Sequence, residues 1–481
     1  MDRQIRKLGV ALLVLFSALF VRLNHIQVVE AQELQNKPGN TRKATKDFAR
    51  ERGVIQTADG VVLAQSVPVD SAFKRLRQYP EKELFGHLTG FFSFTYGSSG
   101  LERAYNDDLA GRSERLRGVR DLLSDRTRTG NVTITVTKRL QTVAKDALGN
   151  RRGAVVALDP TTGAVLAMWA YPSFDPNPLS AHDQRAVQQA YQSLSADPAA
   201  KPMRSRAYQE RYAPGSTFKV VTAAAALEKQ PDLVTKSYPS QRELDLPQTN
   251  RNLRNFGGGT CGGALRDLLR VSCNTGFAQM GLDMGADKLV DQAKAFGFES
   301  RPPIDLTAVA TSVLGEDDLA RNKPALAYSS IGQQSVSATP LQMALVAAGV
   351  ANGGVVMKPH LLAEVRDSEG QVVRSAQPEE WKRAMSPANA AALRDMMVGV
   401  VNDGTATRAK VPGAQVAAKT GTAQTVGNSA HAWIVAFAPA EAPKVAVAVI
   451  VESQSGNDDN LTGGRVAAPI AAAVIRAALG S

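Results

Sequence analysis

The chain has 481 residues, of which 44% are hydrophobic and 21% charged, a balance typical of a folded protein and unlike that of a disordered one. The net charge of +11 admits a nucleic-acid partner, but the basic residues are scattered and form no patch interleaved with aromatic residues. A protein that works beside an anionic membrane or wall polymer explains the charge as well, so we expect no nucleic-acid partner. The two cysteines exclude a disulfide scaffold, and none of the five histidines lies in a metal-ligand cluster, so we expect no metal and no cofactor.

An apolar run follows a basic amino terminus. Arg3, Arg6 and Lys7 precede Leu8–Val21, whose fourteen residues would span about 21 Å as a helix, less than the roughly 30 Å hydrocarbon core. One apolar face of the helix continues beyond the run, however, and no Ala-x-Ala-like cleavage site follows the run. We therefore favour an uncleaved membrane anchor over residues 1–29 rather than a cleaved signal peptide. The basic residues before the span predict a cytoplasmic amino terminus, with the rest of the chain outside.

The second section, residues 30–145, contains segments typical of short strands. Arg52–Ile55 and Asp59–Ala64 predict a hairpin joined by an Asp-Gly turn. Gly97–Glu102 carries the pattern Gly-x-x-Gly-Leu-Glu, and Asn131–Thr137 alternates as a half-buried strand does. We expect a small domain rich in β-structure.

The third section, residues 146–481, begins and ends with strand-like runs. Turn residues join the first two runs, and a helix closes the chain after the last. The strand-like runs are Ala154–Leu158, Ala164–Ala170, Val416–Thr422, Ala432–Ala438 and Val445–Val451, and the closing helix is Ala467–Leu479.

Ala213–Lys219 leads into an almost purely apolar run that ends at Leu227. Because Pro-Gly is a turn signal and the run has the composition of a buried helix, Ser216 is predicted at or near the first turn of that helix. Lys219 lies three residues later on the same face. A helix amino terminus favours a developing oxyanion, and a lysine held against an apolar helix can act as a base near neutral pH. Ser-x-x-Lys alone is commonly a simple helix start, and Ser71–Lys74 has the same spacing but is followed by charged residues.

Two partner motifs follow in order, Ser272-Cys273-Asn274 and Lys419-Thr420-Gly421-Thr422. Each alone is commonly a helix cap or a strand entering a turn. Together with Ser216 and Lys219 they form the triple of penicillin-binding proteins and serine β-lactamases. With the segments Arg52–Ile55 and Gly97–Glu102 included, nearly the whole chain resembles the class B penicillin-binding proteins, the membrane-anchored D,D-transpeptidases of peptidoglycan that β-lactams inhibit covalently. One departure is Cys273, where the familiar motif has aspartate.

The resemblance implies an α+β fold of three parts. Residues 1–29 would be the cytoplasmic tip and anchor, residues 30–145 a non-catalytic pedestal of the class B dimerisation type, and residues 146–481 the transpeptidase domain. The last would be an antiparallel sheet flanked by helices, with an all-helical subdomain inserted in mid-sequence.

The resemblance also implies catalytic roles. Ser216 would attack the carbonyl between the two terminal D-alanines of a stem peptide, and Lys219 would accept its proton. Ser272 would relay a proton to the leaving D-alanine with Lys219 or Lys419. Asn274 would donate to a substrate amide carbonyl or orient Lys219.

The third motif implies a substrate-binding strand. Lys419, Thr420 and Thr422 would face the substrate carboxylate while the substrate backbone adds to the strand edge. Gly421 would let the ligand approach closely. The backbone N–H groups of Ser216 and Thr422 would form the oxyanion hole.

Other segments are interpreted as scaffold. We expect Gly332-Gln333-Gln334 to lie behind the site. His431 and Trp433, just past the third motif, are expected to pack and to form hydrogen bonds rather than to transfer protons.

The resemblance predicts peptidoglycan stem peptides, β-lactam antibiotics and the cytoplasmic membrane as partners. Residues 30–145 are too few for a glycan polymerase, so a separate multi-span polymerase and other wall-synthesis proteins are expected. A serine β-lactamase or a β-lactam sensor would share the motifs. The former needs no anchor or pedestal, and the latter normally carries several membrane spans.

Cys261 and Cys273 lie twelve residues apart, and the anchor places both in an oxidising compartment. A disulfide between them is favoured over two separate thiols. Such a bond would hold the loop that carries Ser272 and Asn274.

Overall fold

The computed structural model of the chain describes residues 2–26, 30, 45, 48–71, 73–112, 129–315, 318–424, 430–453 and 461–480. Much of two stretches of the predicted pedestal section, residues 31–47 and 113–128, lies outside the described residues. The chain divides into two compact units, one formed by Met1–Glu51 and Val67–Leu76 and the other by Arg52–Ser66 and Arg77–Ser481.

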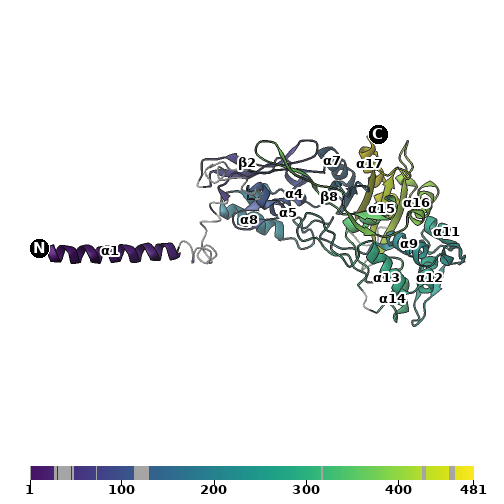
Figure 1. Cartoon of the computed structure of the whole chain (residues 1–481). Coiled ribbons are helices and arrows are strands. Elements are labelled where there is room, and N and C mark those ends of the chain that lie inside the picture. Colours follow the sequence, from purple (N-terminus) through teal and green to yellow (C-terminus); the bar gives the residue numbers. More distant parts are fainter. Residues whose placement is uncertain are drawn as a thin grey trace. The chain divides into compact units, whose positions relative to one another are not determined.

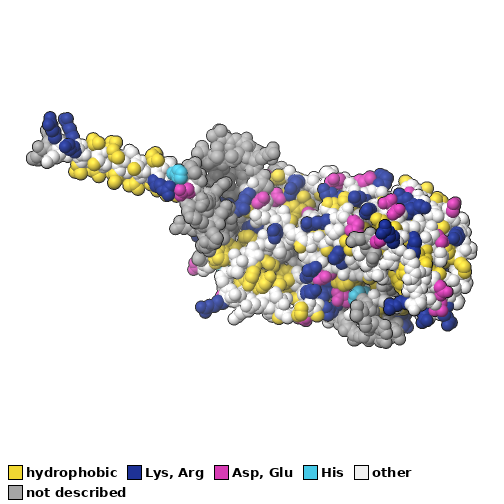
Figure 2. Space-filling model, turned by 90° about the horizontal axis from the view of Figure 1, so that it is seen from below, with side chains coloured by type: hydrophobic (Ala, Val, Ile, Leu, Met, Phe, Trp, Pro, Cys, Tyr) yellow, Lys and Arg dark blue, Asp and Glu magenta, His cyan; other side chains and the backbone are white. Residues whose placement is uncertain are grey.

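The first unit contains helix α1 (Asp2–Asn24). Its 23 residues span about 34 Å, which is enough to cross the roughly 30 Å hydrocarbon core of a bilayer. Hydrophobic side chains lie along the exposed helix, and Lys and Arg side chains gather at its amino-terminal end (Figure 2). By length and composition, α1 is a candidate single membrane span.

A mixed six-stranded sheet is built mostly from the second section of the sequence. Its strands lie in the order β15-β14-β6-β1-β2-β3. The predicted hairpin forms by antiparallel pairing of β1 with β2, and its turn places Gly60 at a φ of +80°, where glycine is favoured. The strands are β1 (Ile55–Gln56), β2 (Val62–Pro68), β3 (Arg75–Gln78), β6 (Asn131–Ile134), β14 (Leu362–Arg366) and β15 (Val372–Ser375).

The hairpin of β14 and β15 comes from far along the chain. β14 pairs antiparallel with β6, so that Val365 lies opposite Val132. Residues within the predicted range 146–481 thus complete a sheet begun by residues 55–134. The division into sections at residues 145 and 146 stays a prediction.

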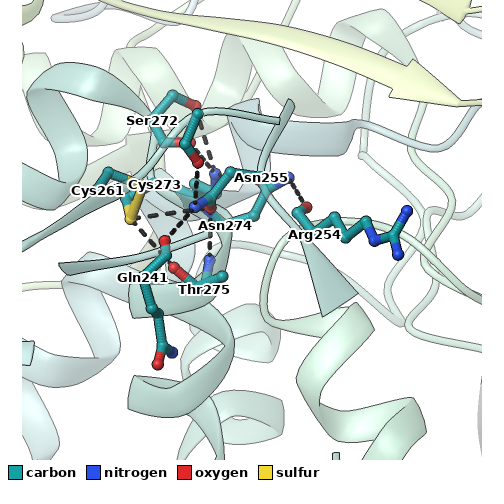
Figure 3. The surroundings of a disulfide bond; sticks show 10 residues. Gln241, Arg254, Asn255, Cys261, Ser272, Cys273, Asn274 and Thr275 are labelled. Atoms are coloured by element: carbon teal, nitrogen blue, oxygen red, sulfur yellow. Dashed lines mark hydrogen bonds between the residues drawn. A yellow bond between two sulfur atoms is a disulfide. The ribbon is translucent and has the colours of Figure 1, made fainter. Parts of the chain in front are cut away.

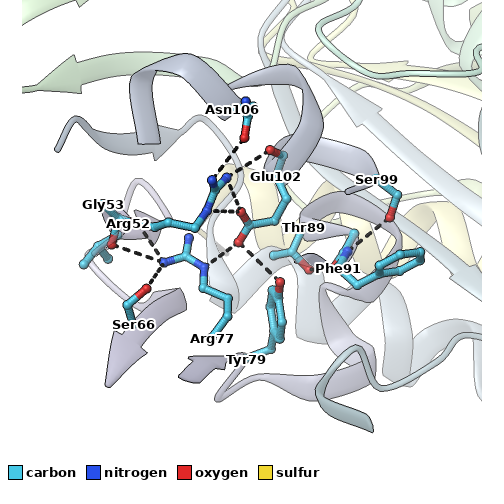
Figure 4. A network of polar contacts seen from close by, with 12 residues as sticks. Arg52, Gly53, Ser66, Arg77, Tyr79, Thr89, Phe91, Ser99, Glu102 and Asn106 are labelled. Atoms are coloured by element: carbon cyan, nitrogen blue, oxygen red, sulfur yellow. Dashed lines mark hydrogen bonds and ion pairs between the residues drawn. The ribbon is translucent and has the colours of Figure 1, made fainter. Parts of the chain in front are cut away.

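A buried ion-pair cluster joins the Arg-Gly and Gly-Leu-Glu segments of this region. The fully buried carboxylate of Glu102 lies 2.9 Å from Arg52 Nη2 and 2.6 Å from Arg77 Nε, and it accepts a hydrogen bond from the Tyr79 hydroxyl (Figure 4). Burial opposes the charged form, but the guanidiniums of Arg77 and Arg52 hold the pKa of Glu102 below its usual range. Gly53 is required because an added Cβ would lie 1.9 Å from the carbonyl oxygen of Gly130.

Several short elements complete this part of the chain. The helical ones are α4 (Gly86–Thr89), α5 (Gly100–Ala104), α6 (Asn106–Leu109) and α8 (Gln184–Ser195), and the strands are β4 (Phe92–Ser93) and β5 (Gly97–Ser98).

The second sheet is antiparallel and joins both ends of the predicted transpeptidase section, in the order β17-β18-β19-β7-β8 (Figure 1). All residues of β7 and β19 are buried, which explains their continuous runs of Val, Ala, Ile and Leu. The strands are β7 (Gly153–Leu158), β8 (Val165–Tyr171), β17 (Ala417–Gln424), β18 (Ala430–Ala438) and β19 (Val445–Val451).

Helices cover this sheet. The helices α7 and α17 pack against each other and against the sheet, α15 packs against β19 and β7, and α16 packs against β17. Their bounds are α7 (Lys138–Leu148), α15 (Pro340–Ala351), α16 (Pro387–Asn402) and α17 (Ala468–Leu479). A further ladder pairs β13 (Val355–Met357) with β16 (Glu380–Arg383).

The inserted subdomain is mainly helical. It contains α9 (Lys219–Lys229), α10 (Asp232–Thr235), α11 (Leu265–Val271), α12 (Asn274–Met284), α13 (Ala286–Ala295) and α14 (Lys323–Ser329). The structure adds two small ladders that were not expected, β9 (Tyr238–Gln241) with β12 (Cys261–Gly263) and β10 (Glu243–Asp245) with β11 (Asn252–Arg254). Strands of three or four residues are too short to show a periodic pattern in the sequence.

Candidate active site

A tight turn presents Ser216. Gly215 has a φ of +52° and donates from its backbone N–H to the carbonyl of Gly332, 2.9 Å away. A 3-10 turn over Gly215–Phe218 then continues directly into α9. The Pro-Gly signal thus places Ser216 in the first turn, as predicted, although that turn is tighter than an α-helix. By contrast, Lys74 donates from its backbone N–H to the carbonyl of Ser71 at 3.0 Å and has a φ of +59°, and the strand β3 rather than a helix follows it.

Ser216 lines a cleft of about 1370 Å³. Its lining includes Thr420–Thr422 and Gln424 of the third-motif segment, together with residues 252–262 and 270–272. Gln333 and Gln334 also line the cleft, so part of the segment that we interpreted as scaffold reaches the cavity itself.

Lys219 is fully buried at the start of α9. Its Nζ donates to the carbonyl oxygen of Ser272 and to Oδ1 of Asn274, each at 2.7 Å, and lies 3.3 Å from Ser272 Oγ. Burial, and then the positive charge of Lys419, lower the pKa of Lys219 well below its usual range. This environment favours a neutral amine that can accept a proton near neutral pH.

Lys419, on strand β17 of the antiparallel sheet, contacts the same hydroxyl of Ser272. Its Nζ donates to Ser272 Oγ at 2.8 Å and to the carbonyl oxygen of Thr420 at 2.9 Å. Burial lowers the pKa of Lys419 to about 7. The Ser272 hydroxyl therefore lies between two buried amines. Because the pKa values of both amines are lowered, each can more easily be neutral, and this arrangement is suited to moving a proton.

Ser272 has an uncommon backbone conformation. It ends α11 with φ 62° and ψ 43°, the left-handed region that a residue with a side chain seldom adopts. Such a conformation costs on the order of 1 kcal/mol and is found disproportionately at functional sites. Here it joins α11 to α12 through Cys273 alone, so the carbonyl and hydroxyl of Ser272 both face Lys219.

Asn255 is a residue of the site that the sequence analysis missed. This largely buried side chain accepts hydrogen bonds through Oδ1 from the backbone N–H groups of Asn274 and Thr275, each at 3.0 Å (Figure 3). It therefore caps the amino terminus of α12 from another segment of the chain. Its amide group donates to the carbonyls of Gln241 and Gly259.

Two further links join the same segments. The amide of Asn274 donates to the carbonyl oxygen of Arg254 at 3.1 Å, and Cys261 and Cys273 form a disulfide. Figure 3 shows these contacts gathered around Ser272 and Asn274. The segment 254–261 thus supports the loop that contacts Lys219. The sequence signals only a turn here, since Asn255 and Phe256 precede three glycines, and the residue that Asn255 caps lies nineteen positions away.

Gly421 lines the cleft and also packs closely against neighbouring segments of the chain. An added Cβ would lie 3.0 Å from the carbonyl oxygen of Pro214, 3.0 Å from a methyl carbon of Thr217 and 3.1 Å from Trp433 Cβ. The glycine thus allows β17 to pack against the turn that carries Ser216. This packing brings the first and third motifs together.

The threonines of the third motif differ in environment. Thr420 is largely buried, and its hydroxyl is 2.6 Å from the hydroxyl of Thr405. Thr422 is half-buried and lines the cleft beside the Ser216 turn, since a Cβ at Gly215 would lie 3.0 Å from its carbonyl oxygen.

His431 and Trp433 pack beside the cleft. Trp433 is fully buried, and His431 Nδ1 accepts from the backbone N–H of Ser453 at 3.2 Å. Burial lowers the pKa of His431, with Glu452 acting in the opposite direction.

The fold and the site together define a class of protein: serine acyl-transfer enzymes that place a nucleophile at the start of a buried helix, against the edge strand of an antiparallel sheet. The chain belongs to the penicillin-binding protein transpeptidase family. The family described as penicillin binding protein transpeptidase domain matches residues 153–476, and that described as penicillin binding protein A dimerisation domain matches residues 52–132.

Relatives over the whole chain are named peptidoglycan D,D-transpeptidase PbpA. The protein of Mycolicibacterium smegmatis is 42% identical, with 100% of this chain and 99% of the relative covered. That of Mycobacterium tuberculosis is 41% identical over the same shares of the two chains. The small pedestal rich in alanine and arginine predicts this relationship to penicillin-binding protein A of actinomycetes, and the comparison confirms it.

Solved structures agree. Penicillin-binding protein A of M. tuberculosis, in its acyl-enzyme complex with ceftriaxone, has a TM-score of 0.83 at 41% identity, covering 90% of this chain and 100% of that one. The penicillin G acyl-enzyme complex of the same protein has a TM-score of 0.82 at 41% identity, covering 89% of this chain and 100% of that one.

Proposed function

We propose that this chain is a peptidoglycan D,D-transpeptidase that cross-links stem peptides through an acyl-enzyme on Ser216. The observation that carries the proposal is the meeting of two buried lysines on one serine hydroxyl. Lys219 Nζ and Lys419 Nζ lie 3.3 and 2.8 Å from Ser272 Oγ, and Ser272 lines the same cleft as Ser216. Relatives that share the whole chain length are named for this activity.

In acylation, Ser216 Oγ would attack the carbonyl between the two terminal D-alanines while its proton passes to neutral Lys219. The lowered pKa of Lys219 favours the form that can accept this proton. Ser272, between the lysines, would pass a proton to the amine of the departing D-alanine. The amine of an acceptor stem peptide would then attack the ester, lose its proton by the same route and release Ser216.

Binding of the donor is assigned to β17. Lys419, Thr420 and Thr422 would contact the terminal carboxylate, and the N–H groups of Ser216 and Thr422 would stabilise the oxyanion. Gly421 would contribute by seating the strand against the Ser216 turn. Asn274 would orient Lys219 and contact an amide of the donor.

We assign α1 as a single-pass anchor with the catalytic part outside the membrane. Support comes from its length and its basic amino-terminal end. A separate, multi-span glycan polymerase is proposed as a partner, because residues 30–145 leave little room for a polymerase domain. Polymerisation of lipid-linked precursor by the purified chain alone would contradict this partner.

Covalent labelling tests the function. The full chain in detergent is incubated with fluorescent penicillin, and both labelling and loss of label are followed. Ser216→Ala should abolish labelling. Ser71→Ala, in the second Ser-x-x-Lys segment of the chain, should leave labelling unchanged. Label is expected to persist, since we place no residue in the role of the water-activating glutamate of class A β-lactamases. Rapid catalytic turnover of a chromogenic cephalosporin would favour a β-lactamase instead.

A further inference from the structure

Tyr212 joins the turn that carries Ser216 to the antiparallel sheet. It is partly buried and comes shortly before Ser216 in the chain. Its ring contacts the rings of His431 and Trp433 edge to face, with centroids 5.6 and 6.2 Å away. Both partners lie on β18, where Trp433 is paired with Gly421 of β17. Tyr212 therefore packs on the strand that pairs with the third motif.

The hydroxyl of Tyr212 adds a contact with the end of a further strand. It donates to Glu452 Oε1 at 2.7 Å, and Glu452 directly follows β19. The same carboxylate accepts from Arg206 Nε at 2.6 Å and lies 3.3 Å from Arg152 Nε. Burial, and then the negative charge of Glu452, raise the pKa of Tyr212, so its hydroxyl remains a hydrogen-bond donor. A hydrogen bond to a charged acceptor is roughly twice as strong as a neutral one.

Backbone contacts leave the segment from Tyr212 to the turn little freedom. The N–H of Tyr212 donates to the carbonyl of Ala338 at 2.9 Å, and the N–H of Ala338 donates back at 2.8 Å. The N–H of Gly215 donates to the carbonyl of Gly332. An added Cβ at Gly215 would lie 3.0 Å from the carbonyl oxygen of Thr422, so the turn packs tightly against β17. A shift of Tyr212 would therefore change the spacing of the two N–H groups assigned to the oxyanion hole, one on the turn and one on β17.

We propose that Tyr212, through its hydrogen bond to Glu452, is a positioning residue for the acylation of Ser216. The proposal rests on the acyl-enzyme function proposed above and names a contact on which its chemical step depends. Tyr212 does not line the cleft, so it acts through the turn and not on the substrate. A misplacement of about 1 Å in such an arrangement can lower the rate of the chemical step about a hundredfold. Binding of the ligand, which is spread over the cleft, depends less on this one spacing.

The two steps of acylation separate positioning from binding. Saturation kinetics with fluorescent penicillin, on the full chain in detergent, give the dissociation constant of the first complex and the rate constant of acylation. Tyr212→Phe removes only the hydroxyl and keeps the ring on β18. It should lower the acylation rate constant about tenfold and change the dissociation constant by less than about twofold. Tyr212→Leu also loses the aromatic contacts and should lower the rate constant further.

Tyr208→Phe is the matched control, because Tyr208 lies on the same segment and makes a hydrogen bond of the same kind. It is buried, and its hydroxyl donates to the carbonyl oxygen of His87 at 3.0 Å. Like Tyr212, it does not line the cleft. Both phenylalanine variants should lower the midpoint of thermal unfolding, since each leaves a buried acceptor without its donor. Only Tyr212→Phe should lower the acylation rate constant.

A double substitution tests the partner. Glu452→Ala should also slow acylation, and adding Tyr212→Phe to it should lower the rate constant by less than about twofold more, because both changes remove one contact. If Glu452→Ala does not fold, Tyr212→Phe and Tyr208→Phe decide the matter. A native acylation rate constant in Tyr212→Phe, an equal fall in Tyr208→Phe, or a fall that lies in the dissociation constant would overturn the positioning role. A native chain that penicillin does not acylate would instead refute the proposed function.

Discussion

The side-chain oxygen of Asn255 lies 3.0 Å from the backbone nitrogen of Asn274, and this hydrogen bond caps α12 from outside the helix. Asn274 in turn accepts from Lys219 through its side chain. A short chain of contacts therefore runs from a glycine-rich turn to the proposed general base.

Asn255→Ala should lower both stability and acylation. Loss of a cap of this kind costs about 1 kcal/mol, and release of Asn274 should reduce the acylation rate constant about tenfold. Asn255→Asp keeps the acceptor oxygens and should recover part of the acylation rate. Thermal unfolding and penicillin acylation are measured together.

Asp183→Ala is the matched control for that change. Asp183 caps α8 by accepting from the N–H groups of Arg185 and Ala186, and it does not line the cleft. It should lose some stability and keep its acylation rate. If Asn255→Ala acylates as fast as the native chain, the capping contact does not position Asn274.

Replacement of Lys419 should shift the pH profile of acylation. The pKa of Lys419 is about 7, so below that pH its charge disfavours a second charge on Lys219. Lys419→Gln removes this charge, so the pKa of Lys219 should rise and less neutral amine should be present at a given pH. The midpoint of the acidic limb should therefore move to higher pH, whatever the loss in absolute rate. A shift to lower pH would contradict the coupling of the two lysines.

The buried carboxylate of the pedestal should matter for stability rather than for chemistry. Glu102→Gln removes the charge that both Arg52 and Arg77 contact, and leaving buried cations without their partner should cost about 3–5 kcal/mol. Because its pKa is lowered on folding, this contribution is fully present above the unfolded pKa of 4.5 and is lost as the pH falls from there through the lower pKa of the folded state.

A more exposed ion pair provides the comparison. Glu81 pairs with Lys138 at 2.8 Å, and Glu81→Gln should cost at most about 1 kcal/mol. Thermal unfolding across pH 3–8 separates the two variants. If the two variants lose the same unfolding free energy at pH 7, the buried carboxylate of Glu102 contributes no more to stability than an exposed one, and the prediction is wrong.

The disulfide should stabilise the loop that carries Ser272. A bond across a separation of 12 residues is worth about 3 kcal/mol in the chain-entropy model. Cys261→Ala with Cys273→Ala should lower the unfolding free energy by this order. Trypsin can cut after Arg266 and Arg270, so a non-reducing digest should yield linked peptides. If both cysteines can be alkylated in protein purified without reductant, the Cys261–Cys273 disulfide does not form.

The proposed catalytic residues could be chosen from the sequence because their chemistry restricts both residue type and local spacing. Ser216 and Lys219 share one turn of one helix, and the runs around Val155 and Val449 are apolar throughout because both faces of their strands are buried. Such signals lie within a few consecutive residues. They also sufficed to indicate the family.

Tertiary structure decided the features whose partners lie far apart along the chain. Nothing near Asn255 indicates that it caps α12, and nothing near Val365 indicates that β14 joins β6 across more than two hundred residues. Gly421 is a glycine because of Pro214 and Thr217, which only folding brings beside it. The lowered pKa values of Lys219 and Lys419 likewise arise from burial and mutual approach, and burial is a property of the packed fold rather than of either motif.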